Sequence, residues 1–320
     1  MILPLTDDLP DPRIRVVRGA VVVPDQGADL VPHGVFDSRG AFLPLSRARL
    51  SRGRVSAVPE ARAVEGHLPG THLYMGFSHT HFGHFLLEGI ARLWALDHAE
   101  MRIDGLVLPA RGDMDMEHNL SHNLGPVVAR LCDGLPVRIL HVPTRVDRLV
   151  LPSAGFGHGP WLVGTPAFRA FVAKRFAQIE VDGPERLYLT RGRLNRPDQL
   201  VDREDEIEAM MEAAGYFVFA PEKFHFEVQL GVFRAARQIV GPDGSAFHHL
   251  PFAMRGDAQA AVFMRRNRPE VLGYLARQME GFAGITPTTI DPRVRPLPRT
   301  TPAPLDLDVL RDRLGQAGFL

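Results

Sequence analysis

The sequence predicts an α/β protein made of two domains, and three observations support this prediction. The chain has 320 residues and is 45% hydrophobic, which is enough for two cores of ordinary domain size. Short apolar runs bounded by Gly or Pro alternate with helical patterns, as in a parallel sheet covered by helices. The second half repeats this alternation with short links, which is typical of a doubly wound sheet.

In the first half, apolar and β-branched runs predict strands at 13–23, 72–76, 106–109, 137–142 and 148–152. The Gly-, Pro- and Arg-rich stretch 25–70 favours short antiparallel strands, and residues 117–132 favour a helix. The segment 153–166, SAGFGHGPWLVGTP, is rich in Gly and Pro and is the expected hinge. We therefore expect domains at 1–160 and 161–320.

The second half favours strands at 187–191, 216–219, 238–240 and 258–264. Helices are predicted at 166–179, 204–215, 226–237 and 269–282. A proline-rich stretch, 292–304, precedes a last helix at 305–319. This order of elements is the wound α/β layout.

One stretch of the first half combines an apolar helical pattern with titratable residues. If residues 77–97 form a helix from about His81, then His81, His84, Glu88 and Arg92 share one narrow stripe. The rest of that helix is apolar nearly all round, and buried ionisable groups are costly unless they are paired or face a polar cavity. The stripe is either the wall of a cleft or an internal polar network.

Composition excludes several classes of protein. The 37 basic and 37 acidic residues balance, so nucleic acid is not expected as a partner. The single cysteine, Cys132, excludes an intrachain disulfide framework. Residues 1–12 do not read as a secretory signal, and no apolar run approaches the ~18 residues of a transmembrane helix. We expect a cytoplasmic protein, free or associated peripherally with the inner face of the membrane.

Three segments of the second half reach the carboxyl edge of the predicted sheet, where open α/β sheets bind ligands. Arg191 ends one strand, Glu222 follows the next with Gln229 opening a helix, and a glycine turn at 241–246 follows the third. A helix start with unpaired N–H groups beside an arginine suits a diphosphate. The alternatives without a ligand are that the glycine turn only connects two elements, that Arg191 is a solvated strand end, and that Glu222 and Gln229 cap a helix locally.

Two separate motifs resemble the family-61 glycosyltransferases. The first is LYLTR through FRAARQIVGPDGSAFHHLPF, within residues 187–252, and the second is the aromatic-rich helix with His84, Glu88 and the pair Arg92-Leu93. The resemblance implies a GT-B-like fold, with two Rossmann-like domains facing a central cleft. It also implies an inverting transfer from a nucleotide sugar, most often a UDP sugar, to a glycan hydroxyl, as in capsular or other surface polysaccharide synthesis.

The resemblance also suggests residue roles. An inverting transfer needs a base for the acceptor hydroxyl and charge stabilisation for the leaving diphosphate. His84 or Glu88 is the base candidate, with Asp243 as the second. Donor binding falls to residues of the second half: Arg191, Arg203, Glu222, Gln229, Gly244, Ser245 and Ala246. Because arginine and N–H groups can offset the diphosphate charge, no metal or other cofactor is expected.

One position departs from the family pattern. The family commonly has His-Gly-Ala where this chain has Asp243-Gly244-Ser245. An aspartate there places a carboxylate near the diphosphate, unless Arg191 or Arg203 offsets it or the carboxylate turns to a ribose hydroxyl. A degenerate transferase that binds glycan or nucleotide without turnover is therefore one alternative.

A metal-dependent hydrolase is the other alternative. The motif His79-x-His81, with His84 close behind, follows a predicted strand and resembles the opening of amidohydrolases. Such enzymes need a longer barrel of βα units, which this sequence does not show.

Overall fold

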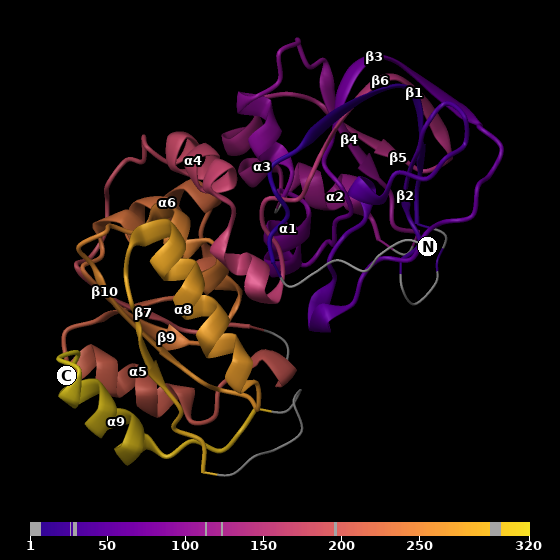
Figure 1. Cartoon of the computed structure of the whole chain (residues 1–320). Coiled ribbons are helices and arrows are strands. Elements are labelled where there is room, and N and C mark those ends of the chain that lie inside the picture. Colours follow the sequence, from indigo (N-terminus) through magenta and orange to yellow (C-terminus); the bar gives the residue numbers. More distant parts are fainter. Residues whose placement is uncertain are drawn as a thin grey trace. The chain divides into compact units, whose positions relative to one another are not determined.

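The computed structural model describes residues 8–25, 27, 31–112, 114–122, 124–194, 197–294 and 302–320 (Figure 1). Parts of the stretches 1–12 and 292–304 lie outside the described residues. The chain divides into two compact units, Met1–Arg175 and Phe176–Leu320. The expected hinge, 153–166, belongs to the first unit, where Gly155 N–H donates to the carbonyl of Ala91.

The first unit contains a six-stranded mixed sheet in the order β2-β1-β6-β3-β4-β5. Its strands are β1 Ile14–Val23, β2 Gly34–Phe36, β3 Gly66–Tyr74, β4 Gly105–Pro109, β5 Val137–Leu140 and β6 Thr144–Pro152. Strands β3 to β6 run parallel to their neighbours in this group, whereas β1 is antiparallel to both β6 and β2. The first unit therefore differs from a wholly parallel sheet. Apolar residues such as Val17, Val22 and Leu149 form its core.

The predicted helix at 117–132 is two helices, α2 Met116–Ser121 and α3 Gly125–Cys132. Asp115 caps the first by accepting a hydrogen bond from His118 N–H at 2.9 Å. Pro126 lies in the first turn of α3, where its missing N–H costs nothing, and it could not have continued a helix from α2. Helix α4, Pro166–Arg175, ends the unit.

The helix that was predicted to run to residue 97 ends much earlier. Helix α1 covers Phe82–Glu88, and a separate 3-10 turn covers Leu93–Asp97. Tertiary contacts explain the break, because Ala91 O accepts from Gly155 N–H and Trp94 Nε1 donates to Ser153 O. The prediction that Arg92 shares a stripe with His84 and Glu88 is therefore wrong.

Arg92 has a structural role instead. Its buried guanidinium donates to three main-chain carbonyls, those of Pro152, Leu45 and Arg47. Gly76, with φ +98°, leaves room for it, because a Cβ there would collide with Nη1 of Arg92.

The second unit confirms the predicted wound α/β layout. Its strands are β7 Arg186–Leu189, β8 Phe217–Phe219, β9 Gln238–Pro242, β10 Gln259–Phe263 and β11 Thr288–Ile290. They lie in the order β11-β10-β9-β7-β8, and every neighbouring pair is parallel. Read from the other edge this is the 2-1-3-4-5 order of a doubly wound sheet.

Helices cover both faces of this sheet. Figure 1 shows α5 Glu204–Ala213 and α9 Leu307–Gln316 on one side, and α6 Phe226–Ala235 and α8 Pro269–Ala283 on the other. Met211 of α5 and Leu314 of α9 belong to the same buried cluster as Tyr188 and Val240 of the sheet. The short helix α7, Leu250–Ala253, follows β9.

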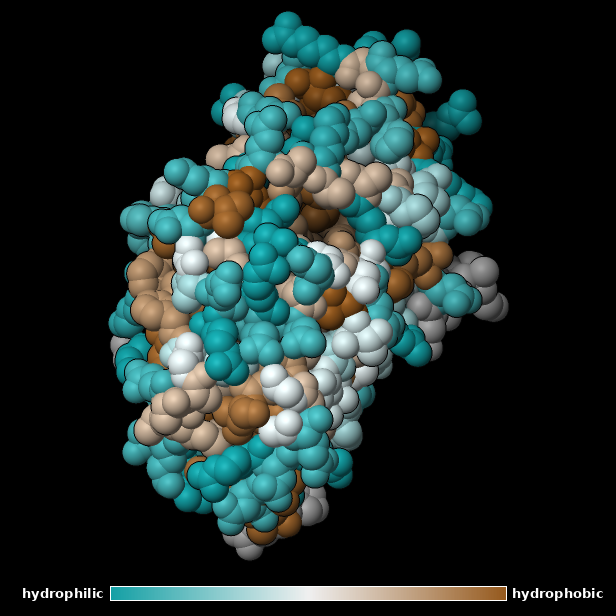
Figure 2. Space-filling view, turned by 90° about the vertical axis from the view of Figure 1, so that its left-hand side faces the viewer, coloured by the Kyte–Doolittle hydropathy of each residue, from teal (hydrophilic) through white to brown (hydrophobic). Residues whose placement is uncertain are grey.

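On the face drawn in Figure 2, the surface is mainly hydrophilic and the hydrophobic residues lie in separate patches. Within the described part of the chain, no helix has both the length and the apolar character needed to cross a membrane.

Candidate functional site

The carboxyl edge of the second sheet holds the first group of candidate residues. Strands β7 and β9 are neighbours in space, but the chain leaves β7 toward β8 on one side and leaves β9 toward β10 on the other. Ligands of open α/β sheets bind where the strand order reverses in this way. Arg191 follows β7 and Gly244 follows β9, so both lie at this position.

The structure brings Arg191 and Gly244 into contact. A Cβ atom on Gly244 would collide with Nη1 of Arg191, so the guanidinium lies directly against the glycine backbone. The Nε atom of Arg191 donates to Gln199 O at 2.8 Å. Among the described residues, Nη1 and Nη2 have no hydrogen-bond partner. Burial lowers the pKa of Arg191, while the carboxylate of Asp243 works against that shift and favours the charged form.

The glycine turn at Gly244 leads into a short helical segment, as the sequence predicted. It begins as a 3-10 turn, Ser245–His248, and continues in the four-residue helix α7, so the helix dipole contributes little. The N–H of Phe247 donates to Gly244 O at 3.1 Å. In the part of the chain that the structure describes, the N–H groups of Ser245 and Ala246 have no such partner. These two donors and the Arg191 guanidinium can face an anion.

Asp243 is buried and fixed by Arg265. Its Oδ1 accepts the main-chain N–H of Arg265 at 2.8 Å, and Nε of Arg265 donates to the carbonyl of Asp243 at 2.8 Å. Arg265, which follows β10, thus offsets the charge of Asp243. This geometry favours a structural role for Asp243 over that of second base. Arg203, in contrast, pairs with Glu206 at the exposed start of α5.

Gln229 supports the loop that carries Glu222. Its Nε2 donates to the carbonyls of Pro221 and Phe224 at 2.8 and 2.9 Å, and its Oε1 lies 2.8 Å from Nε2 of His249. Glu222 is exposed, and its charge acts on Arg191. Gln229 therefore holds the loop before α6 and does not cap a helix, while Glu222 is accessible from solvent.

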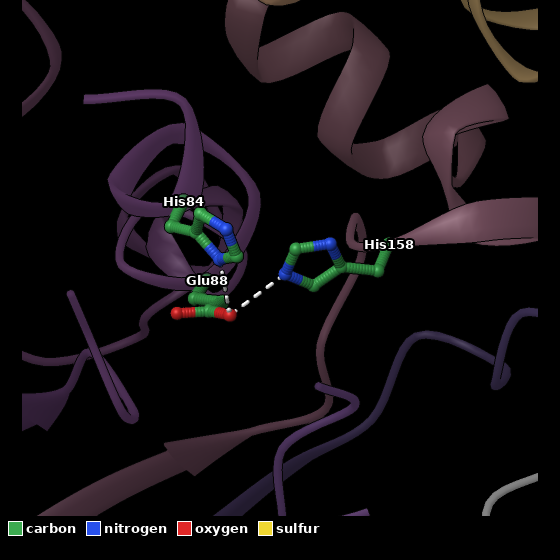
Figure 3. Close-up of side chains that lie close together, drawn as sticks. All are labelled: His84, Glu88 and His158. Atoms are coloured by element: carbon green, nitrogen blue, oxygen red, sulfur yellow. Dashed lines mark hydrogen bonds and ion pairs between the residues drawn. The ribbon is translucent and has the colours of Figure 1, made fainter. Parts of the chain in front are cut away.

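The second group of candidate residues lies in the first unit. His84 and Glu88 are one turn apart on α1, and His158 approaches from the glycine-rich segment after β6 (Figure 3). Oε1 of Glu88 is 3.3 Å from Nδ1 of His84 and 2.7 Å from Nε2 of His158. Because an ionised carboxylate only accepts, both rings donate an N–H to the same oxygen.

Burial divides the roles within this group. The side chain of Glu88 is 3% exposed, whereas that of His84 is 36% exposed and can meet a substrate. Burial alone would raise the pKa of Glu88, but the hydrogen bonds from His158 and His84 outweigh it and lower the pKa to about 2. A carboxylate with so low a pKa is a poor base at neutral pH, so His84 is the better base candidate.

His79 and His81 complete a cluster of rings around His84. The ring centroids of His79 and His81 lie 5.0 and 5.5 Å from that of His84. Nδ1 of His79 accepts the main-chain N–H of His81 at 2.9 Å. Burial lowers the pKa of His79 to about 4, which favours its neutral form.

Both groups fall within one family match. Residues 82–261 match the model of the Glycosyltransferase 61 family, which is more than half of the chain. The chain belongs to this family. A search of curated proteins gave no match.

As a glycosyltransferase, the protein acts on a sugar donor and an acceptor. The match begins at α1 and extends into β10, so it includes His84, Glu88, Arg191 and Gly244. The family assignment replaces the hydrolase alternative that rested on His79, His81 and His84.

Sequence reasoning missed two residues of this glycosyltransferase that hold candidate site residues in place. Glu204 is buried and accepts hydrogen bonds from Thr190 Oγ1 and from the main-chain N–H of Arg191, at 3.0 and 2.7 Å. Its helical spacing with the buried Ile207 and Met211 was a usable signal. His158 gave no such signal, because it lies in an irregular segment.

Proposed function

We propose that the protein is an inverting glycosyltransferase that moves a sugar from a nucleotide sugar, a UDP sugar in the first instance, to a glycan hydroxyl. The observation that carries this proposal is the Arg191 guanidinium at the β7/β9 strand reversal, lying against Gly244 with its two terminal nitrogens available. Surface polysaccharide synthesis, including capsule, is the proposed setting.

The donor diphosphate binds at this edge in the proposal. Arg191 gives charge-assisted hydrogen bonds to phosphate oxygens, and the N–H groups of Ser245 and Ala246 add neutral ones. Glu222, exposed after β8, is placed to accept from ribose or sugar hydroxyls. These donors stabilise the charge that develops on the leaving diphosphate, so the transfer is proposed to need no metal.

The acceptor hydroxyl is deprotonated by His84. With Nδ1–H donated to Glu88, the opposite nitrogen, Nε2, carries the lone pair that can take the proton. The buried anion of Glu88 then stabilises the imidazolium that forms, as the aspartate does in a Ser-His-Asp triad. His158 holds Glu88 from the other side, and the proton leaves the ring to solvent after transfer.

This division of roles is the basis for proposing a GT-B-like enzyme, in which the first unit serves the acceptor and the second unit binds the donor. The five-stranded parallel sheet of the second unit supports the donor-binding role of that unit. The mixed sheet of the first unit supports a less regular version of that fold than two Rossmann-like domains.

A panel of nucleotides and nucleotide sugars tests the proposal. Specific binding raises the melting temperature by mass action, so the best nucleotide identifies the donor class. Release of free nucleotide during incubation with donor and glycan acceptors then measures transfer. Nucleotide binding without any sugar turnover across the panel would favour the degenerate, non-catalytic alternative.

A further inference from the structure

The group His84, Glu88 and His158 has the composition of a metal site. It offers two imidazole nitrogens and one carboxylate oxygen, and these three atoms lie within 4.8 Å of one another. Two ligands one helical turn apart and a third from a distant segment make a preformed, three-point arrangement (Figure 3). Two imidazoles with one carboxylate is a known ligand set for Zn²⁺ with an open fourth position.

The distances also suit an ion. Zinc bonds of about 2.0–2.1 Å at tetrahedral angles separate neighbouring ligand atoms by roughly 3.3 Å. Nδ1 of His84 and Oε1 of Glu88 are 3.3 Å apart, so this pair needs no movement. The distance from Nε2 of His158 to Oε1 is 2.7 Å and would have to increase by roughly 0.6 Å to fit the same tetrahedral geometry.

The two carboxylate oxygens of Glu88 differ in their hydrogen bonding. Both imidazoles converge on Oε1, while Oε2 is buried and has no hydrogen-bond partner among the described residues. A buried anion with one empty oxygen is not fully compensated by two neutral donors. A divalent cation on the Oε1 side would compensate the whole carboxylate charge.

We propose that His84, Glu88 and His158 bind one divalent transition-metal ion of the zinc class. The ion replaces the two N–H donors, so each ring takes the tautomer that carries its proton on the other nitrogen. In His84 that nitrogen is Nε2, which then has no lone pair for an acceptor proton. The bound ion therefore inhibits the transfer proposed above; binding itself does not rest on that function.

The test starts with metal binding by the full chain. After treatment with EDTA and its removal, the protein is titrated with Zn²⁺ against a chromophoric zinc indicator. We expect one ion per chain. His158→Ala and Glu88→Gln should each weaken binding at least tenfold, because the loss of a residue that only orients a metal ligand already costs about tenfold to a hundredfold. His141→Ala is the matched control, because His141 pairs with Glu117 at 2.5 Å on the surface of the same unit.

Two results would overturn the inference: no zinc binding by the unaltered chain, or zinc binding by both ligand variants as tight as that of the unaltered chain. If His158→Ala does not fold, Glu88→Gln gives the same comparison, and Co²⁺ replaces Zn²⁺ as a spectroscopic probe of the coordination geometry in the unaltered chain. A Co²⁺ spectrum of the hexa-aqua ion alone would count against the site.

A separate arm measures transfer. Activity should be full with EDTA and fall on addition of Zn²⁺, and zinc should inhibit His141→Ala as strongly as the unaltered chain. Activity that requires zinc would contradict the inhibitory role. Absence of transfer with every donor would refute the proposed function while leaving the binding result intact, so the two failures can be told apart.

Discussion

The guanidinium of Arg191 fills the space that a side chain on residue 244 would need. The two residues meet because β7 and β9 are neighbours in the sheet although β8 lies between them in the chain. The position of the cation therefore depends on the size of the residue at 244. This relationship gives two ways to disturb the proposed donor site, by removing the guanidinium or by displacing it.

Replacing Arg191 by alanine should weaken binding of the preferred nucleotide about tenfold to a hundredfold. A hydrogen bond to a charged group contributes about 1.5–3 kcal/mol, and about 1.4 kcal/mol is tenfold in affinity. Calorimetric titration measures the change. Arg193→Ala is the control, because Arg193 is exposed on the same loop and pairs with Glu208. Equal affinity of both variants would remove Arg191 from the phosphate role.

Gly244→Ala should also weaken nucleotide binding, with little change in melting temperature. The φ of Gly244 is 179°, which alanine adopts without strain, so the added methyl group acts only by displacing the end of Arg191. Gly273→Ala is the matched control, since a Cβ there, on α8, meets nothing within 4 Å. Binding retained in both variants would show that the exact place of the guanidinium does not matter.

Glu88→Gln should lower kcat about a hundredfold and leave the KM for donor unchanged. The amide keeps the shape but cannot stabilise the imidazolium of His84, and general base catalysis contributes about 10²–10⁴-fold. Initial rates at saturating acceptor measure the effect. Glu117→Gln, at an exposed carboxylate paired with His141, should behave as the unaltered enzyme. A raised donor KM with normal kcat would place Glu88 in binding instead.

His33 should make the first unit sensitive to mild acid. Burial lowers its pKa to about 4 against an ordinary value of 6.5, so between these values the unfolded chain binds more protons than the native one. Stability is therefore full above pH 6.5 and falls as the pH drops to 4, by up to about 3 kcal/mol. Urea unfolding of His33→Asn should show a flatter profile over this range, whereas the exposed His98→Asn should not.

Arg92→Lys should destabilise the protein by roughly 3 kcal/mol. A lysine cannot span the carbonyls of Pro152, Leu45 and Arg47 together, and each buried acceptor left unpaired costs about 1–3 kcal/mol. Thermal unfolding measures the loss. Arg102→Lys, at a side chain that is 90% exposed, should change nothing. A small effect at Arg92 would mean that water satisfies these carbonyls.

The sheet-edge rule is why the proximity of residues in the proposed donor site could be predicted. Arg191 and the 241–246 turn each follow a strand, and parallel strands end at one edge, so their proximity follows from the order of elements. The 3-10 geometry of the turn after Gly244 did not follow from that order, because only the folded structure shows that Ser245–His248 is a 3-10 turn and that α7 is a separate helix with Pro251 in its first turn. Local sequence patterns locate the end of a strand better than they predict the conformation of the segment that follows it.

Arg92 and His158 have contacts that local sequence patterns did not predict. The periodicity that grouped Arg92 with His84 and Glu88 assumed a continuous helix, and the carbonyls that bind Arg92 come from segments distant in the chain. His158 lies in an irregular segment, and only the folded structure brings it to Glu88. Both partners are long-range, so no window of local sequence contains them.

The end of α1 at Glu88 has a further consequence for how this protein can vary. One more helical turn would have carried the guanidinium of Arg92 toward the Glu88 carboxylate, and the strongest cation nearby would have neutralised it. Because the helix ends at Gly89, Arg92 donates to main-chain carbonyls of other segments, and the Glu88 carboxylate is bound by two histidines. Insertion or deletion of even one residue between 88 and 92 should therefore be less tolerated than most substitutions there.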